Sequence, residues 1–281
     1  MTGVQTCALP ILYAQNKFVA VEEQAYAIYS TDGMSWTTAT IPSGANGWTG
    51  LGYGNNLFIA TDGYGNVSMY STDAVTWTSG GTLPSSAGWT SSIAYGAGKY
   101  VTVCAGNSGQ TTVAAYTTNG VSWTATTLPT AKYWTSVAWG ASKFVAVAQG
   151  DDSSNTTDSY ATSTDGITWT ARTLPYSLTY KNIIYNSTLG KFFVTSTYSS
   201  TMLSSTDGIT WSGQSLTNSA KWIGITTMQV GTVSFDAYNI YTTPALTETT
   251  VTSIFATNQD TSSSHTFSVA VVPSGESLST K

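Results

Sequence analysis

Charge is the scarcest property of this 281-residue chain. Only 8% of its residues are charged, against roughly 25% in an average soluble domain. Nine Lys and Arg against fourteen Asp and Glu give a formal net charge of −5, so the chain lacks the basic surface that nucleic-acid binding requires. It also lacks an apolar run of about eighteen residues, which excludes a membrane-spanning helix.

Side chains that commonly carry catalysis are also few. The chain has one arginine, Arg172, and one histidine, His265. The sequence shows no glycine-rich phosphate loop, no zinc-ligand spacing and no Ser/His/Asp set. We therefore expect neither a metal nor a cofactor, and catalysis has no support from motifs.

Aromatic, glycine and hydroxyl-bearing residues take the place of charge. The chain contains 10 Trp, 17 Tyr and 26 Gly, and 41% of its residues are hydrophobic, enough for an ordered core. A surface built from hydroxyls rather than charges favours an extracellular or virion-borne protein.

The first residues, Met1–Ile11 (MTGVQTCALPI), resemble the translation of a common sequencing adapter. They also lack the basic segment that opens a signal peptide. We leave them out of the expected fold, and Cys7 with them. Cys104 is then the remaining cysteine, so we expect no intrachain disulfide.

A heptapeptide recurs five times along the chain. Its copies are Ser30–Trp36 (STDGMSW), Ser71–Trp77 (STDAVTW), Thr117–Trp123 (TTNGVSW), Ser163–Trp169 (STDGITW) and Ser205–Trp211 (STDGITW). The tryptophans that end them are spaced 41, 46, 46 and 42 residues apart. An apolar run such as Lys143–Val147 (KFVAV) and an aromatic-led run such as Trp134–Gly140 (WTSVAWG) precede the copies in register. A repeat of this length indicates one structural unit per copy.

Each unit contains four strand-like runs and no helical periodicity. In the fourth unit the runs are 134–139, 143–147, 159–163 and 167–173, separated by Gly, Asn and Asp turn signals. Four short strands in a period of about 40 to 46 residues are typical of a β-propeller blade. We therefore predict an all-β chain: a β-propeller at 12–236 with about five to six four-stranded blades.

The heptapeptide resembles the Asp-box (BNR) hairpin of sialidases, xyloglucan-cleaving endoglucanases and many non-enzymatic propellers. It lacks one residue of the longer family pattern, S-x-D-x-G-x-T-W. An Asp-Gly pair favours a tight turn because Gly accepts positive φ and the Asp side chain bonds nearby N–H groups. We therefore assign structural roles to the residues at the acidic position, which are Asp32, Asp73, Asn119, Asp165 and Asp207. Asn119 supports this assignment, since an amide can accept hydrogen bonds in a turn but is no nucleophile.

Ligand binding is expected at the end of the propeller opposite the heptapeptides, because variable loops on a rigid scaffold commonly carry function. With the strands of a blade named a to d, the b–c and d–a loops meet there, and the enzymes of the resemblance have their active sites at this loop-rich end. The b–c loops are expected at 22–24, 61–66, 105–110, 149–158 and 198–201, and the d–a loops at 41–47, 83–88, 128–133, 174–179 and 216–221.

Aromatic residues open the predicted inner strands at this end: Trp48, Trp89, Trp134, Tyr180 and Trp222. They can form a ring of stacking platforms for sugars, or they can be buried in the core, which we favour. Trp89 is one residue farther from its partner Tyr95 than its counterparts are from theirs, so it needs a β-bulge to keep its orientation.

Carboxylates at the loop-rich end are the candidates for binding or hydrolysis. A glycosidase needs two of them about 5–9.5 Å apart, and the candidates are Glu22, Glu23, Asp62, Asp151, Asp152 and Asp158. The neighbours Glu22 and Glu23 would point apart on an extended chain. Asp62 lies in DGYGN, which favours a β-turn over a calcium loop. The resemblance to sialidases implies three arginines around the substrate carboxylate, and one arginine cannot supply them.

After Trp222 the repeat decays. The segment 237–281 resembles the start of a small β-sandwich module found in predicted tailed-phage virion proteins, and we expect it to be truncated. Together these features favour a non-enzymatic propeller from a phage tail fibre or similar virion appendage, homo-oligomeric, that binds a host-surface glycan or protein. A secreted carbohydrate-active hydrolase is the alternative, and a bacterial assembly or adhesion propeller is a third.

Overall fold

The computed structural model describes residues 10–22, 26–45, 47–84, 88–106, 109–150 and 156–221. The chain divides into two compact units, Met1–Gln229 and Val230–Lys281, and all described residues belong to the first. Trp222, Asp151, Asp152, Glu23 and the C-terminal segment 237–281 lie outside the described residues. Within the described part the secondary structure consists of β-strands and contains no helix, as predicted.

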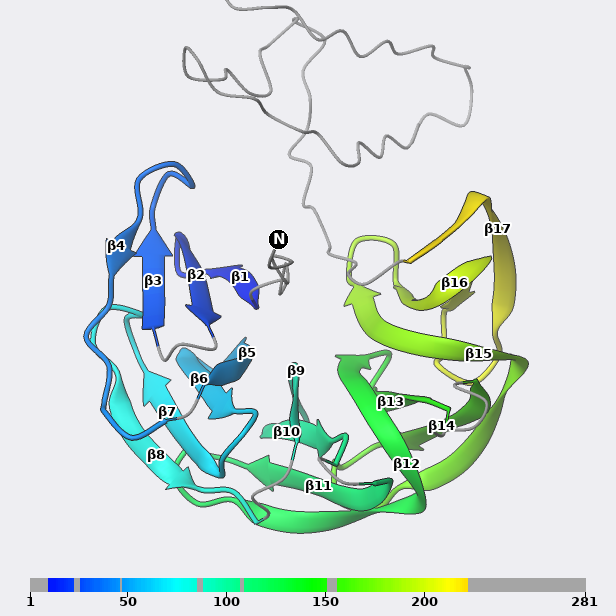
Figure 1. Ribbon diagram of the computed structural model, residues 1–281, viewed down its shortest axis with the longest axis horizontal. Coiled ribbons are helices and arrows are strands. Elements are labelled where there is room, and N and C mark those ends of the chain that lie inside the picture. Colours follow the sequence, from blue (N-terminus) through cyan, green and yellow to red (C-terminus); the bar gives the residue numbers. More distant parts are fainter. Residues whose placement is uncertain are drawn as a thin grey trace, which may run out of the picture. The chain divides into compact units, whose positions relative to one another are not determined.

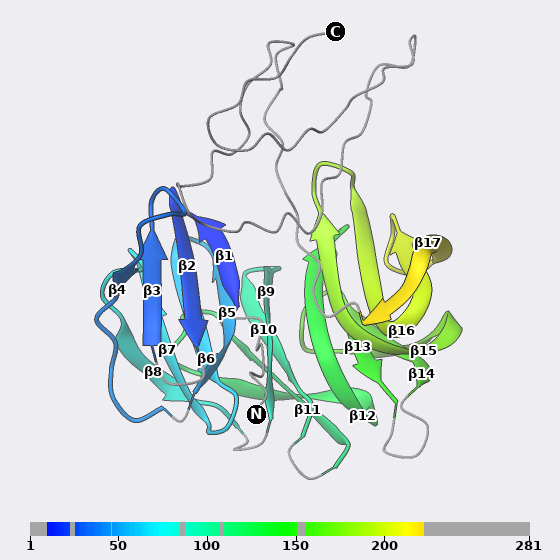
Figure 2. The same cartoon turned by 45° about the horizontal axis from the view of Figure 1, so that its top comes forward.

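The strands form five blades that follow one another around a common centre (Figures 1 and 2). Blade 1 contains β1 (Ile11–Ala14), β2 (Lys17–Glu22), β3 (Tyr26–Ser30) and β4 (Thr37–Thr38), and blade 2 contains β5 (Trp48–Gly54), β6 (Leu57–Asp62), β7 (Val67–Ser71) and β8 (Thr78–Thr82). Blade 3 contains β9 (Trp89–Gly96), β10 (Lys99–Cys104), β11 (Thr111–Thr117) and the first part of β12 (Thr124–Gly140). Blade 4 contains the rest of β12, β13 (Lys143–Gln149), β14 (Thr157–Ser163) and the first part of β15 (Thr170–Asn186), and blade 5 contains the rest of β15, β16 (Lys191–Ser205) and β17 (Ser212–Lys221).

The chain runs without interruption from the outer edge of one blade into the inner strand of the next at β12 and β15. Strand β12 pairs with β11 through its first part and with β13 from Tyr133 onward. The predicted d–a loops at 128–133, 174–179 and 216–221 are therefore wrong, because these residues lie inside β12, β15 and β17. In β12 a register shift against β11 accommodates 128–131 as an irregularity of the strand.

Two further boundaries differ from the sequence prediction. The expected b–c loop at 198–201 lies within β16. Strand β1 starts at Ile11, which pairs with Ala20, although we had left this residue out of the fold. Ile11 extends the pairing of β1 with β2 by one residue, because its backbone N–H and C=O groups gain hydrogen-bond partners there.

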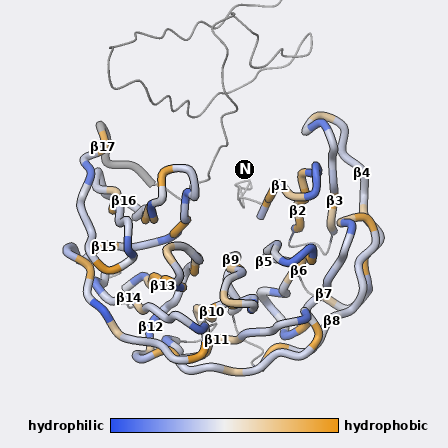
Figure 3. Tube along the Cα trace, turned by 180° about the vertical axis from the view of Figure 1, so that it is seen from behind, coloured by the Kyte–Doolittle hydropathy of each residue, from blue (hydrophilic) through white to orange (hydrophobic). Residues whose placement is uncertain are grey.

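The second strand of each blade is buried on both faces, as its apolar sequence predicts. In blade 4 the residues from Phe144 to Val147 are all inaccessible to solvent. Since the sheet of blade 4 packs between those of blades 3 and 5, both faces of this strand contribute to the hydrophobic core. Figure 3 shows that the apolar residues are accordingly spread over the strands of all blades rather than gathered in one region.

Aromatic pairs mark the a–b hairpin of every blade. Ring centroids are 4.6 to 4.8 Å apart in the five pairs Tyr13–Phe18, Tyr53–Phe58, Tyr95–Tyr100, Trp139–Phe144 and Tyr185–Phe192. The tryptophan that ends the heptapeptide adds a third ring in four blades, for example Trp169 at 6.4 Å from Phe144. In these four blades the cluster attaches the heptapeptide turn to the core of its own blade.

Candidate functional site

The acidic residue of each heptapeptide organises the turn in which it lies. In blade 4, Ser163 Oγ donates a hydrogen bond of 2.9 Å to Asp165 Oδ1, which also accepts the N–H groups of Ile167 and Thr168 at 2.8 Å. Equivalent bonds surround Asp32, Asp73 and Asp207. In blade 3, Asn119 Oδ1 accepts the N–H groups of Val121 and Ser122 at 2.9 Å. The Oδ1 atom of each side chain is therefore engaged inside its own turn.

These bonds also set the charge state of the turns. The N–H of Ser35 is the main reason that the pKa of Asp32 is lowered to about 2, and the N–H of Thr210 does the same for Asp207. The pKa values of Asp73 and Asp165 are lowered for the corresponding reason. A general acid needs a raised pKa to hold its proton near neutral pH, so this chemistry does not suit these carboxylates.

The same turns connect neighbouring blades. Tyr160 of blade 4 donates from Oη to Gly208 O at 3.3 Å and to Ile209 O at 3.2 Å, both in the turn of blade 5. Thr126 of blade 3 donates to Ile167 O in the turn of blade 4 at 2.5 Å. The turns thus act as contacts between blades, at the end of the molecule opposite the expected ligand site.

The aromatic residues that open the inner strands are buried. Trp48, Trp89, Trp134 and Tyr180 are at most 3% exposed. Trp134 Nε1 donates to Thr111 O at 3.2 Å, and Tyr180 Oη donates to Tyr176 O at 2.6 Å. Burial raises the pKa of Tyr180 well above its ordinary value. An exposed ring of stacking platforms does not fit these four residues, whereas the core alternative does.

A β-bulge places Trp89 in the core despite its irregular spacing. Along β9, Trp89 and Ile93 are four positions apart, while their partners Cys104 and Thr102 on β10 are two positions apart. The matching bulge in β5 sets two residues against one, between Trp48 and Gly50. The larger bulge in β9 absorbs the additional residue, as the sequence spacing requires.

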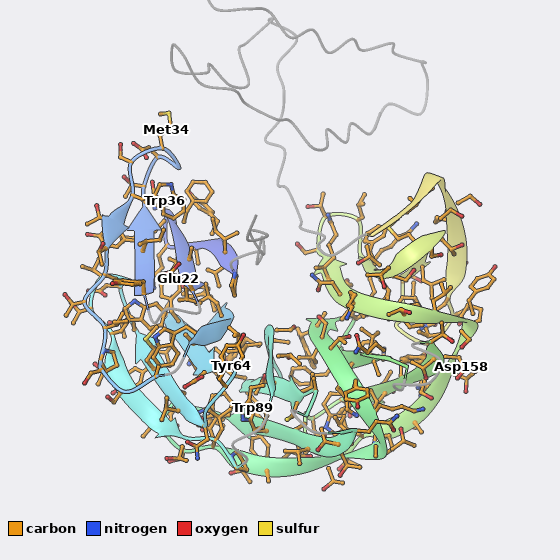
Figure 4. The ribbon with its side chains drawn as sticks, viewed as in Figure 1. Glu22, Met34, Trp36, Tyr64, Trp89 and Asp158 are labelled. Atoms are coloured by element: carbon orange, nitrogen blue, oxygen red, sulfur yellow. The ribbon has the colours of Figure 1, made fainter. Side chains whose placement is uncertain are left out.

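The candidate carboxylates that the structure describes come from three different blades. Asp62 is buried, and its Oδ1 accepts the N–H groups of Tyr64 and Gly65 at 2.9 Å, so the Asp side chain holds the bend that follows it. Glu22 is half-buried at the end of β2, and Asp158 is exposed on β14. Glu22, Asp62 and Asp158 thus belong to blades 1, 2 and 4, and Figure 4 shows Glu22 far from Asp158. Asp62, whose Oδ1 is bonded inside its own loop, and the widely separated Glu22 and Asp158 do not make the pair that a glycosidase needs.

Sequence reasoning missed the exposed tyrosines of the loop-rich end. Tyr64 is 54% exposed in the turn that Asp62 organises, and Tyr26, which begins β3, is 53% exposed. Tyr64 is labelled beside the blade 2 strands in Figure 4. An aromatic residue between two glycines in a b–c loop was the available signal, since Gly63 and Gly65 leave it without bulky neighbours.

Two kinds of feature are absent from the part of the chain that the structure describes. It contains no cluster of three or more His, Cys, Asp or Glu side chains able to hold a metal ion. It also contains no helix long and apolar enough to span a membrane.

The arrangement of strands defines the chain as a β-propeller, which confirms the predicted fold at that level. It is similar to seven-bladed propellers of known structure. Virginiamycin B lyase from Staphylococcus aureus superposes with a TM-score of 0.62 at 14% identity, over 74% of this chain and 69% of the lyase. A streptogramin B lyase gives 0.61 at 13% identity, over 74% and 68%. YCF48 bound to D1 peptide gives 0.50 at 15% identity, over 72% and 64%.

Structural similarity at such low sequence identity establishes the fold and says nothing about activity. No protein-family model matches the chain, and no curated protein matches it in sequence. The function therefore has to be argued from the site itself.

Proposed function

We propose that this chain is a non-enzymatic binding module that recognises a host-surface glycan or protein through its loop-rich end. The observation that carries the proposal is Tyr64, which is exposed on a turn fixed by two hydrogen bonds to Asp62. A rigid aromatic side chain with a polar tip gives a large contact area at low entropic cost. The burial of Asp62, whose Oδ1 is bonded inside its own loop, and the distance between Glu22 and Asp158 favour binding over hydrolysis.

We place the module in an extracellular or virion appendage such as a phage tail fibre, with the heptapeptides as Asp-box hairpins. The composition, poor in charge and rich in hydroxyls, supports this setting. A homo-oligomeric appendage would present several copies of one weak site, and avidity of about 10²–10⁴ would then compensate for low intrinsic affinity.

Adsorption of the purified oligomer to candidate host cells tests the proposal. We expect saturable binding that the Tyr64→Ala variant weakens and that pre-treatment of the cell surface with glycosidases or proteases removes. Turnover of polysaccharides by the wild-type protein would overturn the non-enzymatic assignment. Full adsorption by the Tyr64→Ala variant would overturn the assignment of the site.

A further inference from the structure

Neighbouring blades meet through unlike faces. We call the face of a blade that carries the aromatic pair and the heptapeptide tryptophan its ring face. In blade 2, Phe58 and Trp77 of the ring face share one hydrophobic cluster with Val19 and Val21 of blade 1. The ring faces of blades 4 and 5 pack in the same way on blades 3 and 4. At these interfaces the ring face is covered by the blade that precedes it in the chain.

Blade 1 has a ring face of the same composition, and no described blade covers it. The rings of Tyr13 and Trp36 lie 4.7 and 6.5 Å from the ring of Phe18, so the aromatic cluster is complete. Trp36 is nevertheless 38% exposed, whereas its counterpart Trp77 is 4% exposed. In Figure 1, blade 1 has blade 2 on one side and no described strand on the other.

Two further positions of the ring face show the same contrast. Phe18 on the second strand and Ile28 on the third are half-buried. The residues at the matching positions of blades 2 to 5 are at most 1% exposed: Phe58, Tyr100, Phe144 and Phe192 on the second strand, and Met69, Ala115, Ala161 and Leu203 on the third. A repeat that ends an array in water needs a polar outer face. An exposed apolar face of this kind marks an interaction surface instead.

We infer that the ring face of blade 1 binds a further blade of the same repeat, joined ahead of blade 1 in the same polypeptide. The fitting partner presents aliphatic side chains from its second strand, as Val101 and Val103 of blade 3 do to blade 4. It also leaves space at the end of its inner strand for the ring of Tyr13, as Gly96 does for Trp139. The seven-bladed propellers similar to this chain have two blades more than the five that the structure describes.

A second copy of this chain does not offer a matching surface among its described blades. In blades 1 to 4 the face that would be needed already packs on the next blade. The inner strand of blade 5 ends at Asn186, which pairs with Lys191 as Gly140 pairs with Lys143 in blade 4. The asparagine side chain takes the space that glycine leaves for an aromatic ring.

An extended chain tests the inference. A copy of residues 89–136, which include blade 3, replaces residues 1–10 and is joined directly to Ile11. The junction keeps the strand register, because Ile11 and Val137 pair with equivalent residues of their second strands. Hydroxyl-radical footprinting with mass spectrometry then measures the oxidation rate of each side chain in the original and the extended chain.

We expect the oxidation rates of Tyr13 and Trp36 to fall severalfold in the extended chain, to the rates of Tyr53 and Trp77. Met34 is the matched control, since it is 66% exposed in the same turn as Trp36. Its rate should not change, because its counterparts stay exposed where the ring face is covered, namely Val121, Ile167 and Ile209.

Two variants examine the contact from either side. In the extended chain, Gly96→Trp in the copied repeat removes the space for the ring of Tyr13 and should restore its oxidation. In the original chain, Trp36→Ser should lower the Tm distinctly less than Trp77→Ser, because Trp36 buries less of its surface. This second comparison does not require the added repeat to fold.

The outcomes decide both the surface and its partner. Unchanged oxidation of Tyr13 and Trp36 in the extended chain would overturn the inference, whether or not the added repeat is itself protected. Equal losses of Tm in Trp36→Ser and Trp77→Ser would also overturn it, since the ring face would then already be covered. Sedimentation of the original chain separates the partners. A dimer whose formation protects Trp36 from oxidation would assign this face to a second copy and overturn the inferred partner.

Discussion

The indole ring of Trp139 in blade 4 lies directly over Gly96 at the end of the inner strand of blade 3, so that a Cβ on this glycine would overlap the ring. Tyr95 lies in the same way over Gly54, and Tyr185 lies over Gly140. Three successive blade interfaces therefore use a glycine to receive an aromatic ring from the next blade. This contact needs the absence of a side chain at the glycine rather than any special backbone angle.

Replacing Gly96 by alanine should destabilise the protein by overpacking. A methyl group at this position forces the indole of Trp139 out of its place, which typically costs about 1–3 kcal/mol in a packed core. Urea unfolding of Gly96→Ala measures the loss. In the double variant Gly96→Ala/Trp139→Leu the loss should be smaller than the sum of the losses in Gly96→Ala and Trp139→Leu, because the smaller side chain leaves room for the methyl group. Strictly additive losses would contradict the contact.

Two effects oppose a side chain at Gly166: its backbone conformation and the space around it. Its φ is +73°, and a Cβ would lie 2.7 Å from Val101 Cγ2 in the preceding blade. Gly98 has a nearly equal φ of +72°, and no atom lies within 4 Å of a Cβ there. Gly98→Ala should therefore lose about 1 kcal/mol from backbone strain, and Gly166→Ala should lose distinctly more free energy of unfolding. Equal losses of unfolding free energy in the two variants would show that Gly166 is not in tight steric contact with Val101 of blade 3.

Ser136 links the inner strands of blades 4 and 5. Its buried hydroxyl accepts the N–H of Ile183 at 3.3 Å and lies 3.1 Å from Asn182 Oδ1. Ser136→Ala leaves the amide of Ile183 and the side chain of Asn182 without this partner, and should lower the free energy of unfolding by about 1–3 kcal/mol. Ser122→Ala, at an exposed position of a turn, is the control and should change it little. Chemical denaturation measures the free energy of unfolding of both variants. An unchanged value for Ser136→Ala would show that this hydrogen bond does not stabilise the contact between blades 4 and 5.

The lowered pKa of Asp207, about 2, predicts loss of stability in acid. The unfolded chain takes up this proton near pH 4, before the folded protein does, so the contribution is complete above pH 4 and declines as the pH falls toward 2. Asp207→Asn should flatten the dependence of unfolding free energy on pH in this window, because an amide oxygen accepts the same N–H groups at Asn119 without titrating. Asn119→Asp should steepen it. Unchanged profiles in both variants would contradict this electrostatic role.

The sequence was sufficient where structure depends on local chemistry. The turn at Asp165 follows from an acceptor side chain and a glycine at fixed spacing, and the burial of Phe144 follows from an apolar run. The path of the chain between blades was mispredicted, because continuous pairing of β12 with two different partners depends on neighbours far along the chain. Tyr64 was missed although its position between Gly63 and Gly65 in a b–c loop was a local signal of exposure.

Aromatic rings over glycines and hydroxyls on turn carbonyls recur from one interface to the next. When a whole repeat of 41 to 46 residues is exchanged, duplicated or removed, the flanking blades can therefore form the same kinds of contact with their new neighbours. The exposed loops of such a scaffold can diversify one repeat at a time. A new binding specificity can then arise by exchange of repeats, without changes to the hydrophobic core.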